Sequence, residues 1–210
     1  MNRCTWSFCR FVLCALLGCC LAAPMGLAKS PEPAEKKEAP KTDAANDEMM
    51  QAMMKLAAPG EHHALLQPLA GKWKTITKAW MGPGDPEVTE GNEESTWVLG
   101  GRFLQDHFKG TFTGMPFEGY GMTGYDNGKK QFVSIWADTM GTGIMMMNGT
   151  ADSAGKLLTF NGTYDDPTTG KPVTYKMVTK ILDDSKHTFS MYRVADGKEN
   201  LEMEITYTRM

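Results

Sequence analysis

The sequence predicts an all-β fold, a closed antiparallel up-and-down barrel of about ten strands, preceded by a short methionine-rich helix. Three observations lead to this fold class. From Lys72 onward apolar and polar residues alternate with a period of two, turn-forming residues separate the alternating runs, and a tryptophan and an arginine bracket them. Trp73 begins the first run and Arg209 ends the last, so barrel closure would place the cation on the indole face. Two unrelated ends of a β-sandwich are the alternative.

The strand pattern is clearest in the last run, where Met203, Ile205 and Tyr207 alternate with glutamate and threonine. Turn sequences such as Asp126-Asn127-Gly128 lie between successive runs and favour hairpins in sequence. Gly119 and Gly121 fall inside one strand and indicate a bend or a close backbone approach. The predicted strands are 72–81, 87–99, 102–113, 116–125, 130–138, 141–150, 156–165, 172–182, 187–194 and 199–209. Together they define a barrel domain over 71–210.

A helical segment over 47–70 is predicted to cover one end of the barrel. Asp47 is suited to cap a helix that ends before Pro59. The apolar face of this helix carries Met49, Met50, Met53, Met54 and Leu56. Such a short helix is not stable alone in water, so we expect its apolar face to dock on the barrel as a movable lid.

The first 28 residues have the layout of an export signal, with Arg3 and Arg10 before an apolar run and small residues up to Ala28. The apolar run of about 13 residues is shorter than the roughly twenty that a transmembrane helix needs. We therefore expect an exported protein, periplasmic or secreted. Residues 29–46 contain no aromatic residue and are predicted to be a disordered linker.

All five cysteines lie within the predicted signal. Cleavage after Ala28 would leave no thiol for a disulfide, a zinc site or a nucleophile. The segment Leu16-Leu17-Gly18-Cys19 resembles a bacterial lipoprotein box, so a lipid anchor at Cys19 is the alternative. The formal net charge of −3 disfavours nucleic acid as a partner. The oligomeric state has no recognisable sequence signal.

A series of motifs in order resembles the signature of one bacterial family. The motifs are Leu99-Gly100-Gly101-Arg102-Phe103-Leu104, Pro116-Phe117-Glu118-Gly119, Gly124-Tyr125-Asp126-Asn127, Trp136 with Asp138, and Thr142-Gly143-Ile144, after Pro59-Gly60-Glu61-His62-His63. The family is one of domains of unknown function, and the resemblance covers about residues 49–210. It implies a lipocalin-like, calycin-type barrel and carries no catalytic residues. Gly71-Lys72-Trp73 with Arg209 is similar to the structural pair of calycins in general.

Polar and aromatic residues gather on the third to fifth predicted strands. The candidate ligand-binding residues are Arg102, His107, Glu118, Tyr120 and Trp136. Those that point inward would form a polar floor in an apolar cup, suited to a ligand with one charged or hydrogen-bonding end. Not all can do so, because Arg102 shares a face with Leu104 while His107 lies on the other. A structural ion pair or hydrogen-bond network between Arg102 and Glu118 is the alternative, and Asp138 is placed to cap a turn.

The predicted function is binding of a small apolar or amphipathic ligand inside the barrel. The alternatives are an enzyme that acts in the same cavity, although no catalytic motif is recognisable, and a filled barrel with a structural role. Two cofactor hypotheses are less favoured. The methionines with His62 and His63 offer soft ligands for Cu(I), yet methionine commonly fills irregular apolar space. His107 or His187 could hold haem, but His187 follows a turn. We therefore expect no cofactor.

Overall fold

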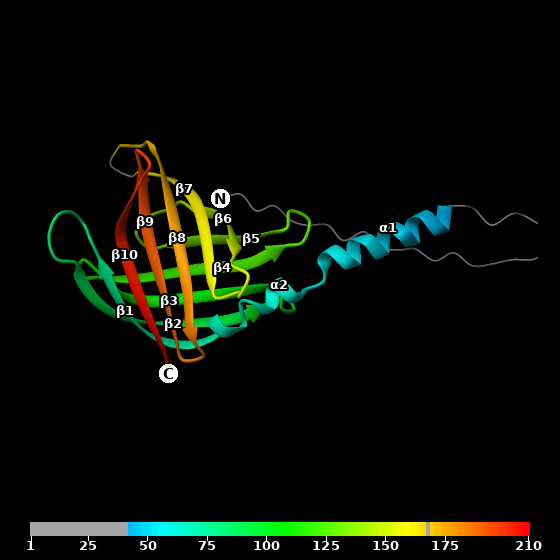
Figure 1. Cartoon of the computed structure of the whole chain (residues 1–210), viewed down its shortest axis with the longest axis horizontal. Helices are drawn as coiled ribbons and strands as arrows, with labels where there is room; N and C mark the ends of the chain where they lie inside the picture. The colour runs from blue at the N-terminus through cyan, green and yellow to red at the C-terminus, as the bar shows by residue number, and fades with distance from the viewer. Residues whose placement is uncertain (1–41, 167–168) are drawn as a thin grey trace, which may run out of the picture. The chain divides into compact units, whose positions relative to one another are not determined.

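Ten antiparallel strands follow one another around a closed barrel in the part of the chain that the computed structural model describes, residues 42–166 and 169–210 (Figure 1). Each strand pairs with the next, and the last pairs with the first. The strands are β1 (Gly71–Ala79), β2 (Glu87–Val98), β3 (Phe103–Phe112), β4 (Met115–Asp126), β5 (Gln131–Asp138), β6 (Met145–Ala151), β7 (Leu157–Asp165), β8 (Pro172–Asp183), β9 (Lys186–Ala195) and β10 (Lys198–Arg209). This confirms the predicted fold class and rules out the sandwich.

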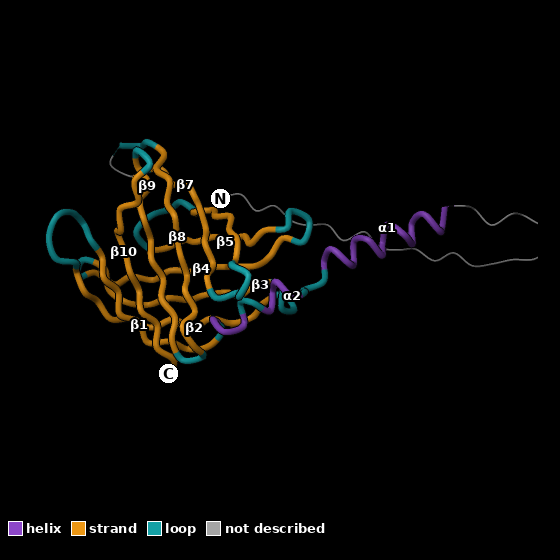
Figure 2. Tube along the Cα trace, viewed as in Figure 1, coloured by secondary structure: helices purple, strands orange, loops and turns teal. Residues whose placement is uncertain are grey.

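The predicted strand order and number are confirmed, and the largest difference at a strand start is in β6. It begins at Met145 instead of residue 141, after a loop that contains Gly141 and Gly143. Glycine has no side chain to pack on a sheet and weakens strand pairing there. Figure 2 shows that strands take up most of the described chain after residue 70.

Closure of the barrel brings Trp73 and Arg209 together as register partners on β1 and β10. The guanidinium carbon of Arg209 lies 4.1 Å from the centroid of the Trp73 ring, which is fully buried. The indole Nε1 donates to the carbonyl of Leu69 at 2.9 Å. Arg209 donates to the carbonyls of Ala70 at 2.9 Å and Pro68 at 3.0 Å. This end of the barrel is thereby tied to the segment that precedes β1.

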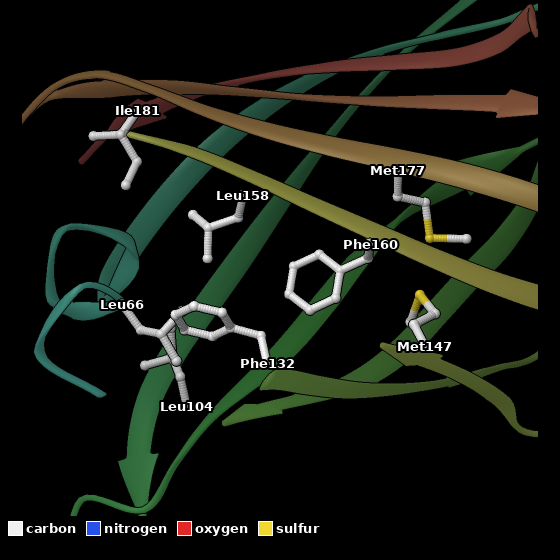
Figure 3. Close-up of a cluster of buried hydrophobic side chains, with 8 residues drawn as sticks. All are labelled: Leu66, Leu104, Phe132, Met147, Leu158, Phe160, Met177 and Ile181. Carbon is white, nitrogen blue, oxygen red and sulfur yellow. The ribbon is translucent and has the colours of Figure 1, made fainter. Parts of the chain in front are cut away.

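That segment contains α2 (Glu61–Ala64) and η1 (Gln67–Leu69), and it covers the end of the barrel where β1 starts. Leu66 is completely buried and belongs to the same buried cluster as Leu104 and Phe132 (Figure 3). The buried cluster to which it belongs comprises Leu66, Leu104, Phe132, Met147, Leu158, Phe160, Met177 and Ile181. Apolar side chains thus close the barrel at this end.

Helix α1 (Thr42–Ala57) begins five residues before the predicted start at Asp47 and includes residues that we expected in the linker. Ala44 and Ala45 are strong helix formers, which accounts for the extension. Its four methionines are between 56% and 66% exposed. The side chain of Asn127 donates to the carbonyls of Leu56 at 2.8 Å and Ala58 at 2.9 Å, so the end of α1 is attached to the β4–β5 turn. Docking of the apolar face as a lid stays a prediction.

The predicted signal, the linker before Thr42 and Cys19 lie outside the described residues. Within residues 42–166 and 169–210, no helix is long and apolar enough to cross a membrane.

Candidate functional site

A cavity of about 490 Å³ lies inside the barrel. Inward-facing residues of every strand line it, and Leu66 and Leu69 lie at its closed end. Its aromatic lining residues are Phe108, Phe112, Phe117, Trp136, Phe160, Tyr164, Tyr175, Phe189 and Tyr207. The volume falls within the roughly 300–1,000 Å³ of small-molecule sites, which are also mostly apolar with a few polar groups.

A cluster of polar side chains interrupts the apolar lining toward the closed end. Glu93 and Ser95 come from β2, Asp106 from β3 and Tyr207 from β10. Ser95 Oγ lies 3.2 Å from Glu93 Oε1 and is also hydrogen-bonded to Asp106, its register partner. Tyr207 hydrogen-bonds to Glu93. We call Glu93, Ser95, Asp106 and Tyr207 the inner cluster.

Burial makes ionisation of the inner cluster unfavourable. Loss of solvent raises the pKa of the Asp106 carboxyl to about 6, against the lowering effect of its hydrogen bond with Ser95. Burial and then repulsion by Asp106 raise the pKa of Glu93 well above its usual value. Burial and the two carboxyl groups also raise the pKa of Tyr207. Two neighbouring buried carboxyl groups are therefore more stable when they share a proton or bind a cation than when both are ionised and unpaired.

His187 on β9 lies beside the inner cluster and is only 5% exposed. Its ring stacks on Tyr207 with 4.1 Å between centroids and meets Trp73 edge-on at 4.4 Å. Burial and the nearby charge of Arg209 lower the pKa of His187 to about 4, so the ring is neutral near pH 7. Within the described part of the chain, His187 Nδ1 and Thr77 Oγ1 have no hydrogen-bond partner. Both residues line the cavity, which therefore has unused polar groups, and His187 is the one next to the inner cluster, as the register partner of Tyr207.

Trp136 and Asp138 on β5 form a separate polar contact in the cavity wall. Trp136 Nε1 donates to Asp138 Oδ2 at 2.8 Å, and the backbone N–H of Met140 donates to Oδ1 at 2.9 Å. The indole lies against Gly119, where a side chain would collide with the ring. The close approach that we predicted at Gly119 is therefore confirmed, and it leaves room for the aromatic wall.

Of the five predicted ligand residues, Trp136 is the one that lines the cavity. Arg102 precedes β3 and donates to the carbonyl of Leu99 at 3.0 Å. His107, Glu118 and Tyr120 face outward, because inward positions of β3 are Leu104, Asp106 and Phe108 and those of β4 are odd-numbered. The expected floor is thus made by other residues.

On the outer face these three residues form a contact network with Lys109. His107 Nε2 lies 2.6 Å from Glu118 Oε1, and the His107 ring stacks on Tyr120 at 4.2 Å between centroids. Lys109 Nζ is 3.4 Å from Glu118 Oε1. Glu118 therefore pairs with His107 and Lys109, in place of the predicted pairing with Arg102. We call His107, Lys109, Glu118 and Tyr120 the outer cluster.

Sequence reasoning missed the inner cluster as a site, although one signal was available. Asp106 lies between Leu104 and Phe108 in the alternation, and Tyr207 follows Ile205 with the same period. The alternation therefore indicates that both side chains face inward. Glu93 lies in a run of mostly polar residues, where alternation gives no direction.

The histidines considered as ligands for haem or Cu(I) lie in different parts of the structure. His187 lines the cavity, whereas His107 belongs to the outer cluster. His63 Nδ1 accepts the N–H of Gly60 at 3.1 Å, and His62 stacks on Tyr125 at 4.2 Å between centroids. Among the residues that the structure describes, no group of three or more histidine, aspartate or glutamate side chains is arranged to hold a metal ion.

Comparisons with known proteins agree with the barrel. A family model described as "Protein of unknown function (DUF1579)" matches residues 58–209. The crystal structure of Rv2717c from M. tuberculosis is similar, with a TM-score of 0.54 and 16% identity over 73% of this chain and 99% of that chain. At this identity the likeness shows the fold alone. A search of curated proteins gave no match.

Two further structures are less similar. One is a redesigned beta barrel, b11L5F_LGL, with a TM-score of 0.38 and 14% identity over 71% of this chain and 95% of that chain. The other is EF1p2_mFAP2b bound to DFHBI, with a TM-score of 0.40 and 14% identity over 71% of this chain and 100% of that chain.

Proposed function

The chain belongs to the DUF1579 family, and from the geometry of its barrel we propose that it binds a small amphipathic molecule in the barrel cavity, with the apolar body against the aromatic wall and the polar end at the inner cluster. The unfilled volume of about 490 Å³ carries this proposal. Protein interiors are normally packed without voids of this size. A barrel with a purely structural role would fill its centre with side chains.

The distribution of lining residues supports an elongated ligand. The wall of Phe112, Phe117 and Trp136 is apolar, and contact with it removes ligand surface from water. The inner cluster lies toward the closed end, near Trp73, the register partner of Glu93. A ligand with one polar end would satisfy both regions at once, whereas a wholly apolar one would leave the polar groups without partners.

An enzyme that acts in this cavity is the second candidate. Its support is the same cluster, because carboxyl groups with raised pKa values in a pocket are typical of general acids and bases. Ser95 contacts the carboxyl groups, and His187 Nδ1 has no hydrogen-bond partner among the described residues, so no serine–histidine arrangement favours acyl transfer. An enzyme would return altered ligand, whereas a binding protein would release the molecule unchanged.

We also propose that the chain is exported, with a lipid anchor at Cys19 as the alternative. The support is the charged, apolar and small-residue layout of residues 1–28. The intact mass of protein from the native host would decide between cleavage after Ala28 and a lipid-modified Cys19. A mass equal to that of the full sequence would contradict both.

Native mass spectrometry of protein purified from its own host is the first test of ligand binding, and we expect a retained small molecule. The second test is a titration with N-phenyl-1-naphthylamine, a neutral apolar dye, followed by fluorescence. Thr179→Trp fills the cavity from β8, whereas Thr174→Trp places the same side chain on the outward face of that strand. We expect the first variant to lose dye binding and the second to retain it. Equal binding by both, with folding checked by circular dichroism, would contradict a site inside the barrel.

A further inference from the structure

The inner cluster contains two carboxyl groups close to each other without a neutralising cation. Among the described residues that line the cavity, none is a lysine or an arginine. Arg209 packs on the Trp73 ring and donates to backbone carbonyls. Arg193 lies 3.2 Å from Asp166 and 3.8 Å from Glu202. Both arginines are thus engaged elsewhere, and the deep end of the cavity has an excess of negative charge when Glu93 and Asp106 ionise.

Hydrogen bonding within the cluster does not use all of its acceptors. The Ser95 hydroxyl has a single proton and can serve only one of the two carboxyl groups at a time. The Tyr207 hydroxyl contacts Glu93. An ionised carboxylate can accept about four hydrogen bonds, so Glu93 and Asp106 together have more acceptor positions than these two hydroxyls can fill.

A second and independent observation points to a ligand at the same place. Thr77 Oγ1 and His187 Nδ1 have no partner among the described residues, although the two side chains are only 7% and 5% exposed. Both residues line the cavity. Buried polar atoms of this kind are nearly always hydrogen-bonded. His187 on β9 is the register partner of Tyr207 on β10, whose hydroxyl contacts Glu93, so His187 Nδ1 lies beside the inner cluster, whereas Thr77 pairs with Thr89 and Ile205 further along β1.

We infer that this end of the cavity binds the ammonium group of an amphipathic amine, with the carboxylates of Glu93 and Asp106 as its ion-pair partners. The inference rests on the proposed function, since the apolar body of the amine would occupy the cavity described above. An ammonium group has three N–H donors, of which two match the carboxylates of Glu93 and Asp106 and the third can bind the free Nδ1 of neutral His187. A fatty acid would add a third negative charge, and an alcohol would leave the carboxyl pair uncompensated.

Amine binding should depend on pH through the groups that face the ammonium position. These are Glu93 with Ser95 on β2, Asp106 on β3, Tyr207 on β10 and His187 on β9. Burial raises the pKa of Asp106 to about 6, so this carboxyl is ionised at pH 8 and largely protonated at pH 5. The pKa of His187 is lowered to about 4, so the ring stays neutral over this range. Binding should therefore strengthen from pH 5 to pH 8.

The experiment compares three ligands with the same alkyl chain and different ends: decylamine, decanol and decanoate. Each is titrated below its micelle concentration into the full chain carrying N-phenyl-1-naphthylamine, and dye displacement is measured at pH 8 and pH 5. At pH 8 we expect decylamine to displace the dye at a concentration about tenfold or more below that of decanol, as expected for a charge-assisted contact. Decanoate should be the weakest, and the preference for the amine should fall at pH 5.

Glu93→Gln and Asp106→Asn keep the shape of each side chain and remove its charge, so both should reduce the preference for decylamine. Glu90→Gln is the matched control, because Glu90 is on the exposed face of β2. Equal displacement by decylamine and decanol at pH 8 would overturn the amine site and leave cavity binding standing. Absence of binding by the dye and by all three ligands would overturn both. The pH comparison uses the unaltered chain, so it tests the amine site even if a variant does not fold.

Discussion

The inner and outer clusters contain similar side chains, and they meet at two adjacent residues of β3. Asp106 points into the barrel and His107 points out of it. The inner carboxyl has a pKa raised to about 6 by burial, whereas the hydrogen bond from His107 lowers the pKa of Glu118 on the outer face. The type of side chain therefore does not decide which polar residues form a candidate binding site. The side of the sheet on which each lies, and whether a cation accompanies it, decides that.

The largest difference between the inward and outward faces of the barrel should appear in the free energy of unfolding. Trp73→Ala removes a fully buried ring beneath the inner cluster and should lower the free energy of unfolding by about 3–5 kcal/mol. Ile76→Ala, on the outward face of the same strand, removes a side chain that is 48% exposed and should cost under about 1 kcal/mol. Urea unfolding followed by circular dichroism measures both. Similar losses would mean that the inner side of β1 is not the core.

A second prediction concerns stability as a function of pH. Because the folded-state pKa of Asp106 is raised from 3.8 to about 6, this group favours folding below its unfolded pKa and loses that contribution as pH rises through 6. Asp106→Asn removes this dependence. The stability of the variant relative to the unaltered chain should therefore increase between pH 4 and pH 8, by an amount that approaches about 3 kcal/mol.

Glu118→Gln is the control for that series, and its sign is opposite. The pKa of Glu118 is lowered, so its contribution is present at neutral pH and is lost as pH falls through the folded-state pKa. The relative stability of this variant should decrease with rising pH, and only slightly, because the group is exposed to solvent. Parallel pH profiles for the two variants would contradict the contrast between the clusters.

The histidines provide a spectroscopic comparison. With its pKa lowered to about 4, His187 should keep the chemical shifts of a neutral ring in NMR spectra down to about pH 5. Because the unfolded state gains a proton first, this histidine disfavours the folded state progressively as pH falls from 6.5 to 4. His187→Gln assigns the signal. A midpoint near the ordinary value of 6.5 would show that the ring is solvated.

The smallest effect is expected for His107→Ala in the outer cluster. His107 and Glu118 are in contact at 2.6 Å, but exposed pairs of this kind contribute little to the free energy of unfolding. Ligand binding in the cavity should be unchanged, since His107 does not line it. Dye titration and urea unfolding of this variant provide the check. Loss of dye binding would place a functional site on the outer face.

The sequence predicted the barrel because its signals are local: alternation sets each strand, and the turn residues set the hairpins. The candidate site was harder to predict because it depends on closure. Glu93 and Tyr207 come from opposite ends of the domain and meet only when β10 pairs with β1 and β1 with β2. The polar run around Glu93 has no alternation that fixes its direction. The candidates from strands three and four were chosen by residue type, and the pleat turned His107, Glu118 and Tyr120 outward.

The seam between β1 and β10 has a consequence for how the chain reaches this structure. Arg209 hydrogen-bonds to Ala70, 139 positions earlier in the sequence. Contacts of such long range are formed only after the entropy of closing a long loop has been lost, so barrels of this topology fold slowly. A ribosome releases β1 first and β10 last. The barrel cannot close until synthesis has reached Arg209, and until then the edge of β1 that pairs with β10 has no strand partner and is accessible to chaperones.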